Sequence, residues 1–313
     1  MSDKLTIIKL AKELSLSKST VQRALASHQN VHPETRRKIL QAAQKKGYMR
    51  HGHGKRDIAI LVPCFSFFGY LGEILMCLEE EFDRRGCMIE LIPINNIELL
   101  GNYMFDGVVS LVWRKGMEKI LPQKFAVPII TINASSNMLE AVPAIMSDPH
   151  GIRLALDYLH RRGCRKIFFI ADLTENIPDA ALRLEEFRSF CLETGQDYES
   201  LHQETKKPEK LVSVILKAKA DACFCAGENY AARIGLQFKA AGVRIPEDIS
   251  LMGLESYLVN ECFTPPITAI RQDFEQIAAV AAESMYQAIV NRIPPACATI
   301  PFQLIERESV RQP

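Results

Sequence analysis

The stretch IIKLAKELSLSKSTVQRAL, residues 7–25, decides how the start of this chain folds. Leu10, Ala11 and Leu14 fall on one helical face, and that face must pack against another element. Ser17 follows a short break and can accept a hydrogen bond from a backbone N–H of the next turn, as an N-cap residue does. The stretch therefore predicts two short helices joined by a tight turn.

The second helix would turn its apolar side chains inward and its polar ones outward. The inward set is Val21, Ala24 and Leu25, and the outward set is Lys18, Ser19, Gln22 and Arg23. A third helix is predicted to begin at residues 32–34, His-Pro-Glu, because proline suits the first helical position and an acid favours the positive end of a helix. It ends at residues 45–47, Lys-Lys-Gly, where glycine can take a positive φ angle. Three such helices predict a helix-turn-helix headpiece over residues 1–48.

Charge separates two interpretations of this headpiece. One is DNA binding, with residues 17–25 as a recognition helix in the major groove; the other is a small three-helix core that docks on the rest of the chain. Residues 1–56 hold thirteen Lys or Arg and three Asp or Glu, whereas residues 57–313 hold twenty-five and thirty-four. The whole-chain charge of +1 thus hides a basic head on an acidic body. That asymmetry suits contact with phosphates and favours DNA binding.

The remainder of the chain alternates apolar runs of strand length with helical segments. A helix is predicted over residues 70–85, between the first two runs. Strands that alternate with helices predict right-handed βαβ units and parallel sheets. The first four predicted strands are DIAILVP (57–63), MIELIPI (88–94), FDGVVSLVW (105–113) and VPIITIN (127–133).

Several motifs together resemble the LacI/GalR family of bacterial transcription regulators. LAKELSLSKSTVQRAL and NVHPETRRKILQAAQKKGY are similar to the family's headpiece. In the body, IMSDPHGIRLALDYLHRRGCRKIFFIAD, KADACFCAGENYAARIGLQFKAAGVRIPEDISLMGLES and FTPPITAIRQDFEQIAAVAAESM match the family's core segments almost throughout. Within the first of these, Asp148-Pro149 is predicted to cap a helix that runs to Arg162.

The resemblance implies an α/β core of the periplasmic-binding-protein type, made of two parallel-sheet subdomains with a ligand cleft between them. The implied first subdomain covers about residues 57–146 and 275–298, and the second about residues 147–274 and 299–313. The tail ATIPFQLIERESV is expected to be the final strand. Residues 49–56, MRHGHGKR, are read as a flexible basic linker, and a metal site at its two histidines is the less favoured alternative.

The chain departs from the family in two places. After Tyr48 there is no hinge helix with an Ala-Arg-x-Leu core, the motif whose leucine enters the minor groove, so reading of the operator's shape is put in doubt. Between Pro93 and Phe105 the chain is shorter than the family pattern, with room for a helical turn or two.

The headpiece residues expected to touch DNA fall into two groups. On the outer face of the second helix, base contacts are expected from Lys18, Ser19, Gln22 and Arg23. Arg23 is the best candidate for a bidentate contact to guanine. Phosphate contacts are expected from Ser17, Thr20, Asn30 and His32.

The resemblance also places four candidate effector contacts. Asn133 ends a strand and Arg183 opens a helix, and both side chains could bond to a small molecule. Glu228 and Glu255 stand where the family usually carries aspartates, so the longer side chains reach differently. Either the effector is unusual or effector binding has been lost.

Composition excludes several other classes of protein. No run of eighteen apolar residues predicts a membrane span, and the charged start MSDKLTIIKLAKEL lacks a signal-peptide core, so a cytoplasmic protein is expected. Nine cysteines without CxxC pairs are expected to be mostly buried thiols, since several of them (Cys64, Cys77, Cys223 and Cys225) lie in apolar runs. Cys223 and Cys225 would share a face of one strand, and a metal or redox site there is the less favoured interpretation. No nucleotide-binding, zinc-protease or nucleophile-elbow motif is present, so we expect no enzyme, metal or cofactor.

The sequence thus predicts a homodimeric, sequence-specific transcription regulator, expected to be a repressor, that reads a near-palindromic operator in double-stranded DNA. A small molecule, expected to be a sugar or sugar derivative, would control it. The alternative is a DNA-binding regulator whose core binds a protein partner or no ligand.

Overall fold

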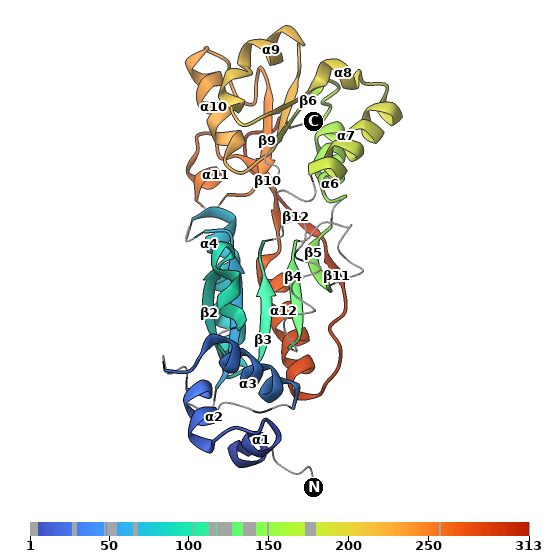
Figure 1. The fold of residues 1–313 in the computed structure, drawn as a ribbon. Helices are drawn as coiled ribbons and strands as arrows, with labels where there is room; N and C mark the ends of the chain where they lie inside the picture. Colours follow the sequence, from blue (N-terminus) through green and yellow to red (C-terminus); the bar gives the residue numbers. More distant parts are fainter. Residues whose placement is uncertain are drawn as a thin grey trace. The chain divides into compact units, whose positions relative to one another are not determined.

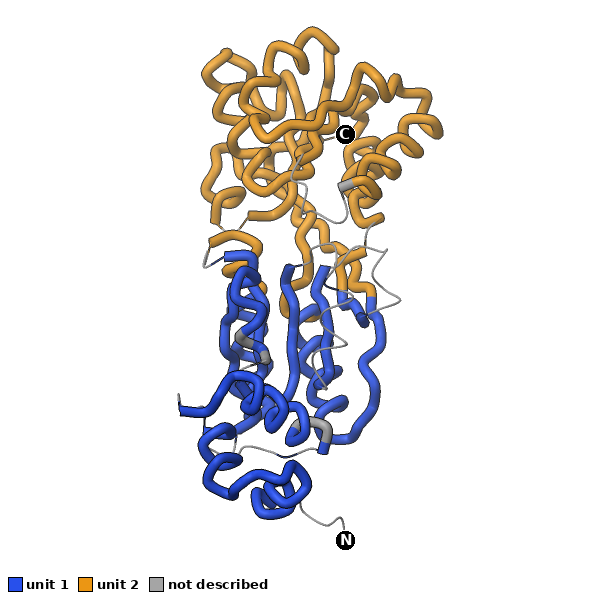
Figure 2. Tube along the Cα trace, viewed as in Figure 1, with its two compact units in different colours: residues 1–66, 75–145, 277–298 blue, residues 67–74, 146–276, 299–313 orange. Residues whose placement is uncertain are grey.

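A computed structural model describes most of the chain, in two compact units (Figures 1 and 2). Unit 1 comprises residues 1–66, 75–145 and 277–298, and unit 2 comprises residues 67–74, 146–276 and 299–313. The described residues are 6–26, 30–46, 48, 55–64, 68–101, 103–112, 117, 127–133, 142–148, 150–172, 180–256 and 258–312. The interpretation of residues 49–56 as a linker, with its two histidines, falls almost wholly outside them.

The three headpiece helices form as the sequence predicts, within unit 1. They are α1 (Ile7–Glu13), α2 (Lys18–Leu25) and α3 (Pro33–Lys45). The Ser17 hydroxyl accepts a bond from the Thr20 backbone N–H at 3.0 Å, which confirms the predicted N-cap, and Thr6 caps α1 in the same way. The inward side chains meet in one core, with Leu10, Val21 and Ile39 fully buried. Met104, from a loop of the same unit, joins this core.

The sheet of unit 1 has the strand order β11-β5-β4-β3-β1-β2. Strands β1 to β5 pair in parallel. All of them are buried along most of their length except the edge strand β2. The helices α4 (Gly69–Arg84) and α12 (Phe274–Val290) start in unit 2 and continue into unit 1. The strands are β1 (Arg56–Val62), β2 (Cys87–Pro93), β3 (Gly107–Ser110), β4 (Ile129–Ile132), β5 (Ala144–Ser147) and β11 (Ala298–Ile300). The short connection after β2, η1 (Ile94–Gly101), is 3-10 helical with a kink at Asn96, in agreement with the predicted turn or two.

The sheet of unit 2 has the strand order β12-β10-β9-β8-β6-β7. All of its pairings are parallel except that of β12 with β10. A core rich in phenylalanine, including Phe168, Phe169 and Phe224, lies on this sheet. The strands are β6 (Ile167–Asp172), β7 (His202–Thr205), β8 (Ala222–Ala226), β9 (Ser250–Leu254), β10 (Thr268–Gln272) and β12 (Phe302–Ile305).

Helices pack against the strands of this second sheet. The longer ones are α6 (Ile152–Arg161), α7 (Ala180–Thr194) and α10 (Tyr230–Ala240). The shorter ones are α8 (Tyr198–Leu201), η3 (Pro208–Lys210), α9 (Val212–Lys217) and α11 (Val259–Cys262). In the part of the chain that the structure describes, no helix is both long and apolar enough to cross a membrane.

Three local predictions were wrong. The tail is not one strand: β11 joins the sheet of unit 1 and β12 that of unit 2, because Pro301 interrupts the run. Asp148 does not cap α6; its carboxylate accepts a bond from the His150 backbone N–H at 3.0 Å, and the N-cap position belongs to Gly151. Cys64 follows the apolar run of β1 but is exposed, since the strand has ended before it.

The pair Cys223 and Cys225 behaves as the sequence predicts. Both thiols are buried on one face of β8, with their Sγ atoms 3.8 Å apart. Burial raises the pKa of the Cys225 thiol well above its ordinary value, which disfavours the reactive thiolate. The described residues contain no group of three or more His, Cys, Asp or Glu side chains placed to hold a metal ion.

Candidate functional site

The first candidate site is the outer face of α2. Lys18, Ser19, Gln22 and Arg23 are all exposed, whereas the opposite face is buried in the headpiece core. Four polar side chains, two of them cationic, are therefore exposed together on one face of a short helix. This is the surface that a recognition helix needs in order to reach base edges in a major groove.

The start of α2 gathers three hydroxyl groups. The Ser17 Oγ lies 2.9 Å from the Ser19 Oγ and 2.7 Å from the Thr20 Oγ1, besides accepting from the Thr20 backbone N–H. The Ser17 hydroxyl is thus engaged in capping α2. This role competes with the phosphate contact that the sequence predicts for the same group. The positive end of the helix dipole still favours an anion here. Asn30 and His32, the other two expected phosphate contacts, are exposed ahead of α3.

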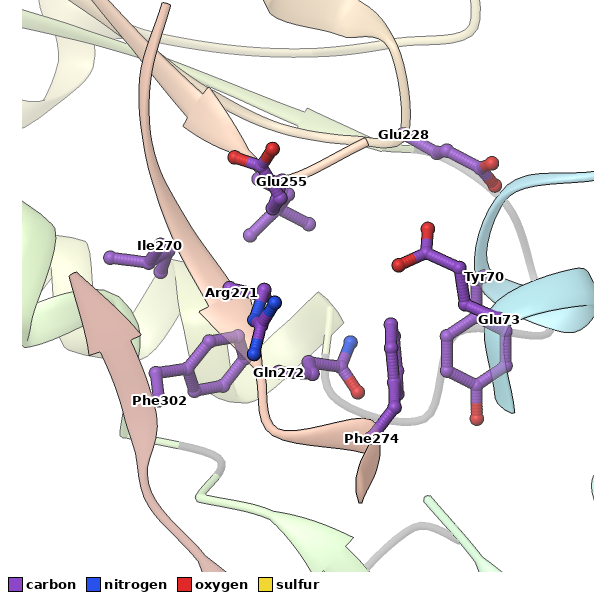
Figure 3. A pocket seen from close by; sticks show the side chains of 10 residues that line it. Tyr70, Glu73, Glu228, Glu255, Ile270, Arg271, Gln272, Phe274 and Phe302 are labelled. Atoms are coloured by element: carbon purple, nitrogen blue, oxygen red, sulfur yellow. The ribbon is translucent and has the colours of Figure 1, made fainter. Parts of the chain in front are cut away.

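The second candidate site is a pocket in unit 2, at the carboxyl ends of β9 and β10 (Figure 3). Ligands of open α/β sheets bind at such strand ends. The pocket is partly open to solvent and has a cavity volume of about 50 Å³. Its lining residues are Tyr70, Glu73, Glu228, Leu254, Glu255, Ile270, Arg271, Gln272, Phe274 and Phe302.

Glu228 lies where the pocket meets the start of α4. Its carboxylate accepts a hydrogen bond from the Tyr70 backbone N–H, in the first turn of that helix. Gly69 makes the approach possible, because a Cβ at this position would overlap the Glu228 Oε1. Desolvation raises the pKa of Glu228, the Tyr70 bond opposes the rise, and the nearby Asp172 carboxylate adds to it. The ionised Glu228 therefore sits at an energetic cost.

Glu255 lines the same pocket but is already paired. Its carboxylate accepts two hydrogen bonds from the Arg307 guanidinium, from Nη1 at 2.8 Å and from Nη2 at 2.9 Å. The side chains are only 11% and 16% exposed, and Arg307 also donates to the Ile267 carbonyl oxygen at 2.7 Å. Such a forked, largely buried pair is strong and geometrically fixed. Glu255 offers a ligand less free charge than its position in the sequence indicates.

The other two expected effector contacts do not line this pocket. Arg183 is 8% exposed on α7, where it donates to the Ala226 carbonyl oxygen at 3.2 Å and so ties α7 to the end of β8. Asn133 belongs to unit 1, directly after β4, and adopts a positive φ of 53°. Its backbone N–H donates to the Ile145 carbonyl oxygen at 3.0 Å.

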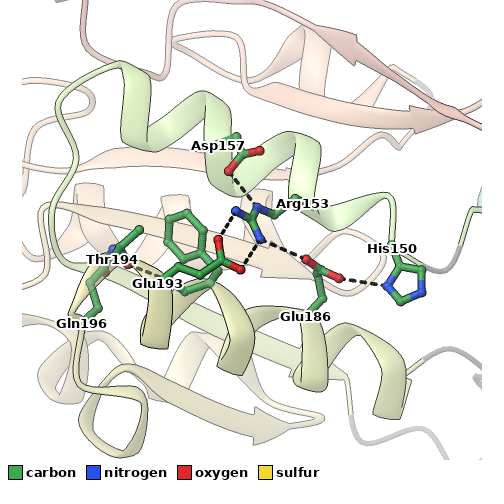
Figure 4. Close-up of polar contacts among 8 residues, drawn as sticks. His150, Arg153, Asp157, Glu186, Glu193, Thr194 and Gln196 are labelled. Atoms are coloured by element: carbon green, nitrogen blue, oxygen red, sulfur yellow. Dashed lines mark hydrogen bonds and ion pairs between the residues drawn. The ribbon is translucent and has the colours of Figure 1, made fainter.

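An ion-pair network anchors α7 on α6 (Figure 4). The Arg153 guanidinium contacts the carboxylates of Asp157 at 2.8 Å, Glu186 at 3.4 Å and Glu193 at 2.5 Å. The His150 Nδ1 completes the network, 2.8 Å from the Glu186 Oε2. The pairs hold in place the helix that carries Arg183.

Sequence reasoning missed most of the pocket wall. Arg271 and Gln272 end β10, inside a segment that was matched by sequence only as part of the core. Their position at the end of a predicted parallel strand was an available signal. Tyr70 and Phe274 meet edge to face, with ring centroids 5.5 Å apart, although they are far apart in sequence. No local pattern indicates such a pairing.

Comparisons with known proteins agree with this architecture. A family model described as "Periplasmic binding protein-like domain" matches residues 156–310. The sucrose operon repressor of Streptococcus mutans is 24% identical over 318 residues, which cover 96% of this chain and 98% of that protein. Two solved structures have a similar fold at a TM-score of 0.70. The cellobiose complex of the transcriptional regulator CelR is 23% identical and covers 97% of this chain and 99% of its own. The lac repressor dimer bound to operator and the anti-inducer ONPF is 17% identical and covers 99% and 100%.

Proposed function

We propose that this chain is a transcription regulator of the LacI/GalR type, which represses transcription by binding operator DNA under the control of a small molecule. The observation that carries this proposal is the exposed polar face of α2 on a basic headpiece. A core of two parallel-sheet subdomains follows that headpiece, as in the relatives.

In this proposal, different headpiece residues contact the bases and the phosphates. Lys18, Ser19, Gln22 and Arg23 read bases, and Arg23 forks to a guanine, a contact worth about 1–3 kcal/mol of discrimination. Phosphates are held by Thr20, Asn30 and His32, together with the positive end of α2. Ser17 contributes mainly by fixing that end of the helix through its cap.

We propose a homodimer that reads a near-palindromic operator. The lac repressor is a dimer in its operator complex, and a two-fold protein places two recognition helices on two equivalent half-sites. Indirect support comes from the charge pattern, because a single basic headpiece of modest size makes few contacts. Pairing two of them on one DNA doubles the contact surface.

The effector site we propose is the pocket lined by Glu228, Glu255, Arg271 and Gln272. The relative CelR is solved with cellobiose, which supports a carbohydrate or a related polar compound as effector. Ligand binding would favour one arrangement of the two units over another and thereby change operator affinity.

The test is a titration of the full chain against DNA, by fluorescence anisotropy. Operator fragments can be selected from a random library, and the affinity measured from 50 to 300 mM salt. We expect a steep fall of affinity with salt, because Lys and Arg displace counterions from phosphates. An affinity that salt leaves unchanged would contradict a basic headpiece on DNA.

A further inference from the structure

The pocket of unit 2 has an unbalanced set of charges. Besides Glu73, which has contacts of its own, its lining holds the carboxylates of Glu228 and Glu255 and one guanidinium, that of Arg271. Behind the wall, Arg307 neutralises Glu255 through the forked pair. Arg271 is in turn 3.4 Å from the Glu275 carboxylate, so its charge is shared with an acid outside the pocket. The surplus charge in the pocket is negative.

The surplus is concentrated at Glu228. Among the described residues, the charged group that acts on this carboxylate is another carboxylate, that of Asp172 at the end of β6. Its compensating contact is a neutral donor, the Tyr70 backbone N–H. Desolvation and a like charge both raise the pKa of Glu228. The ionised group therefore costs stability at neutral pH, which is common for side chains kept for binding.

Two further features restrict the chemical class of ligand that fits this pocket. Tyr70 and Phe274 form one aromatic wall and Phe302 another, and aromatic faces attract cations as well as the apolar faces of ring compounds. The Nε–H of Arg271 is buried and has no hydrogen-bond partner in the described part of the chain. An oxygen acceptor on a ligand would satisfy it, and a buried donor without a partner is costly.

We infer that the effector carries a protonated amine that pairs with Glu228 and, on the same small framework, an oxygen that accepts from Arg271. The chemical class is an amine-bearing polyhydroxylated compound, as an amino sugar is, rather than a neutral sugar. This inference rests on the proposed function only in taking the pocket as the effector site. An ammonium on Glu228 forms a charge-assisted hydrogen bond and relieves the repulsion from Asp172.

The experiment uses the full chain with matched pairs of probes: glucosamine and glucose, galactosamine and galactose, mannosamine and mannose. Thermal shift identifies the binding members, and calorimetry measures their affinities. We expect one amino sugar to bind at least tenfold more tightly than its neutral counterpart. Glu228→Gln should remove that difference, whereas Glu261→Gln, on the exposed helix α11, should leave it unchanged.

Loss of binding in Glu228→Gln will not reflect unfolding. Since the ionised glutamate is destabilised in the folded chain, the neutral glutamine should raise the melting temperature of the free protein or leave it unchanged. Equal affinity for both members of a pair, binding that survives Glu228→Gln, or the absence of binding by every amino sugar would overturn the inference. Operator binding measured on the same samples separates the two proposals: if it persists, only the inference fails, and if it is absent, the proposed function fails.

Discussion

The buried ion pair of Glu255 and Arg307 allows a quantitative prediction. Arg307→Met keeps most of the side-chain volume but removes two charge-assisted bonds and the donor to the Ile267 carbonyl oxygen. The Glu255 side chain, 11% exposed, is then left without its cation. Removal of one partner of such a pair costs about 3–5 kcal/mol, because an uncompensated charge stays in a low-dielectric site. That is a large share of the roughly 5–15 kcal/mol that holds an ordinary domain folded.

The assay is urea unfolding followed by circular dichroism at pH 7. A matched control is Arg244→Met, since Arg244 also forks to a carboxylate, that of Asp248, but in an exposed pair with side chains 70% and 40% accessible. We expect the control to lose less than about 1 kcal/mol. The double variant Arg307→Met/Glu255→Met should recover most of the loss, because it leaves no unpaired charge. Equal losses in Arg307→Met and Arg244→Met would refute the reasoning from burial.

Three further predictions concern the headpiece and pH. Ser17→Ala should destabilise the headpiece by about 1 kcal/mol in thermal unfolding, while Ser17→Asp, which can still cap α2, should not. Arg23→Ala should lower the affinity for selected operator DNA by about 5- to 150-fold in anisotropy titrations, and lower the affinity for random DNA far less. An equal loss of affinity for both would identify Arg23 as a phosphate contact. The Arg244 guanidinium lowers the pKa of Asp248 from 3.8 to about 2, so this pair should stabilise fully above pH 4 and lose its effect as pH falls through 2. An Asp248→Asn variant whose urea midpoint keeps the wild-type pH dependence below pH 4 would contradict that assignment.

The sequence predicted the fold well where local signals agree with packing. The headpiece is the clearest case: apolar spacing at Leu10 and Leu14, the cap at Ser17 and the proline at Pro33 all specify the same three helices. The buried runs of β1 and β8 were equally plain, because strands covered on both faces need apolar residues throughout. The tail was misread because a run on either side of Pro301 looks continuous, and only tertiary pairing sends its halves to different sheets.

The pocket was predicted less well than the fold. Glu228 and Glu255 were selected by position, and both line it. The surroundings of these two carboxylates could not be predicted, because the groups that contact them come from distant segments of the chain. Arg307 neutralises Glu255, whereas Glu228 has only the Tyr70 backbone N–H to offset its desolvation. For Arg183, at the start of a helix, no local signal indicated that its guanidinium donates to the Ala226 carbonyl oxygen of a distant strand.

The most direct test of the central claim is selection of DNA from a random library by the full chain, with Arg23→Ala as the parallel sample. A dimer that reads bases through α2 predicts enrichment of a near-palindromic sequence with two equivalent half-sites. The variant should lose preference at one base pair in each half-site. Enrichment of no sequence by the wild-type chain, or an identical preference in the variant, would contradict the account.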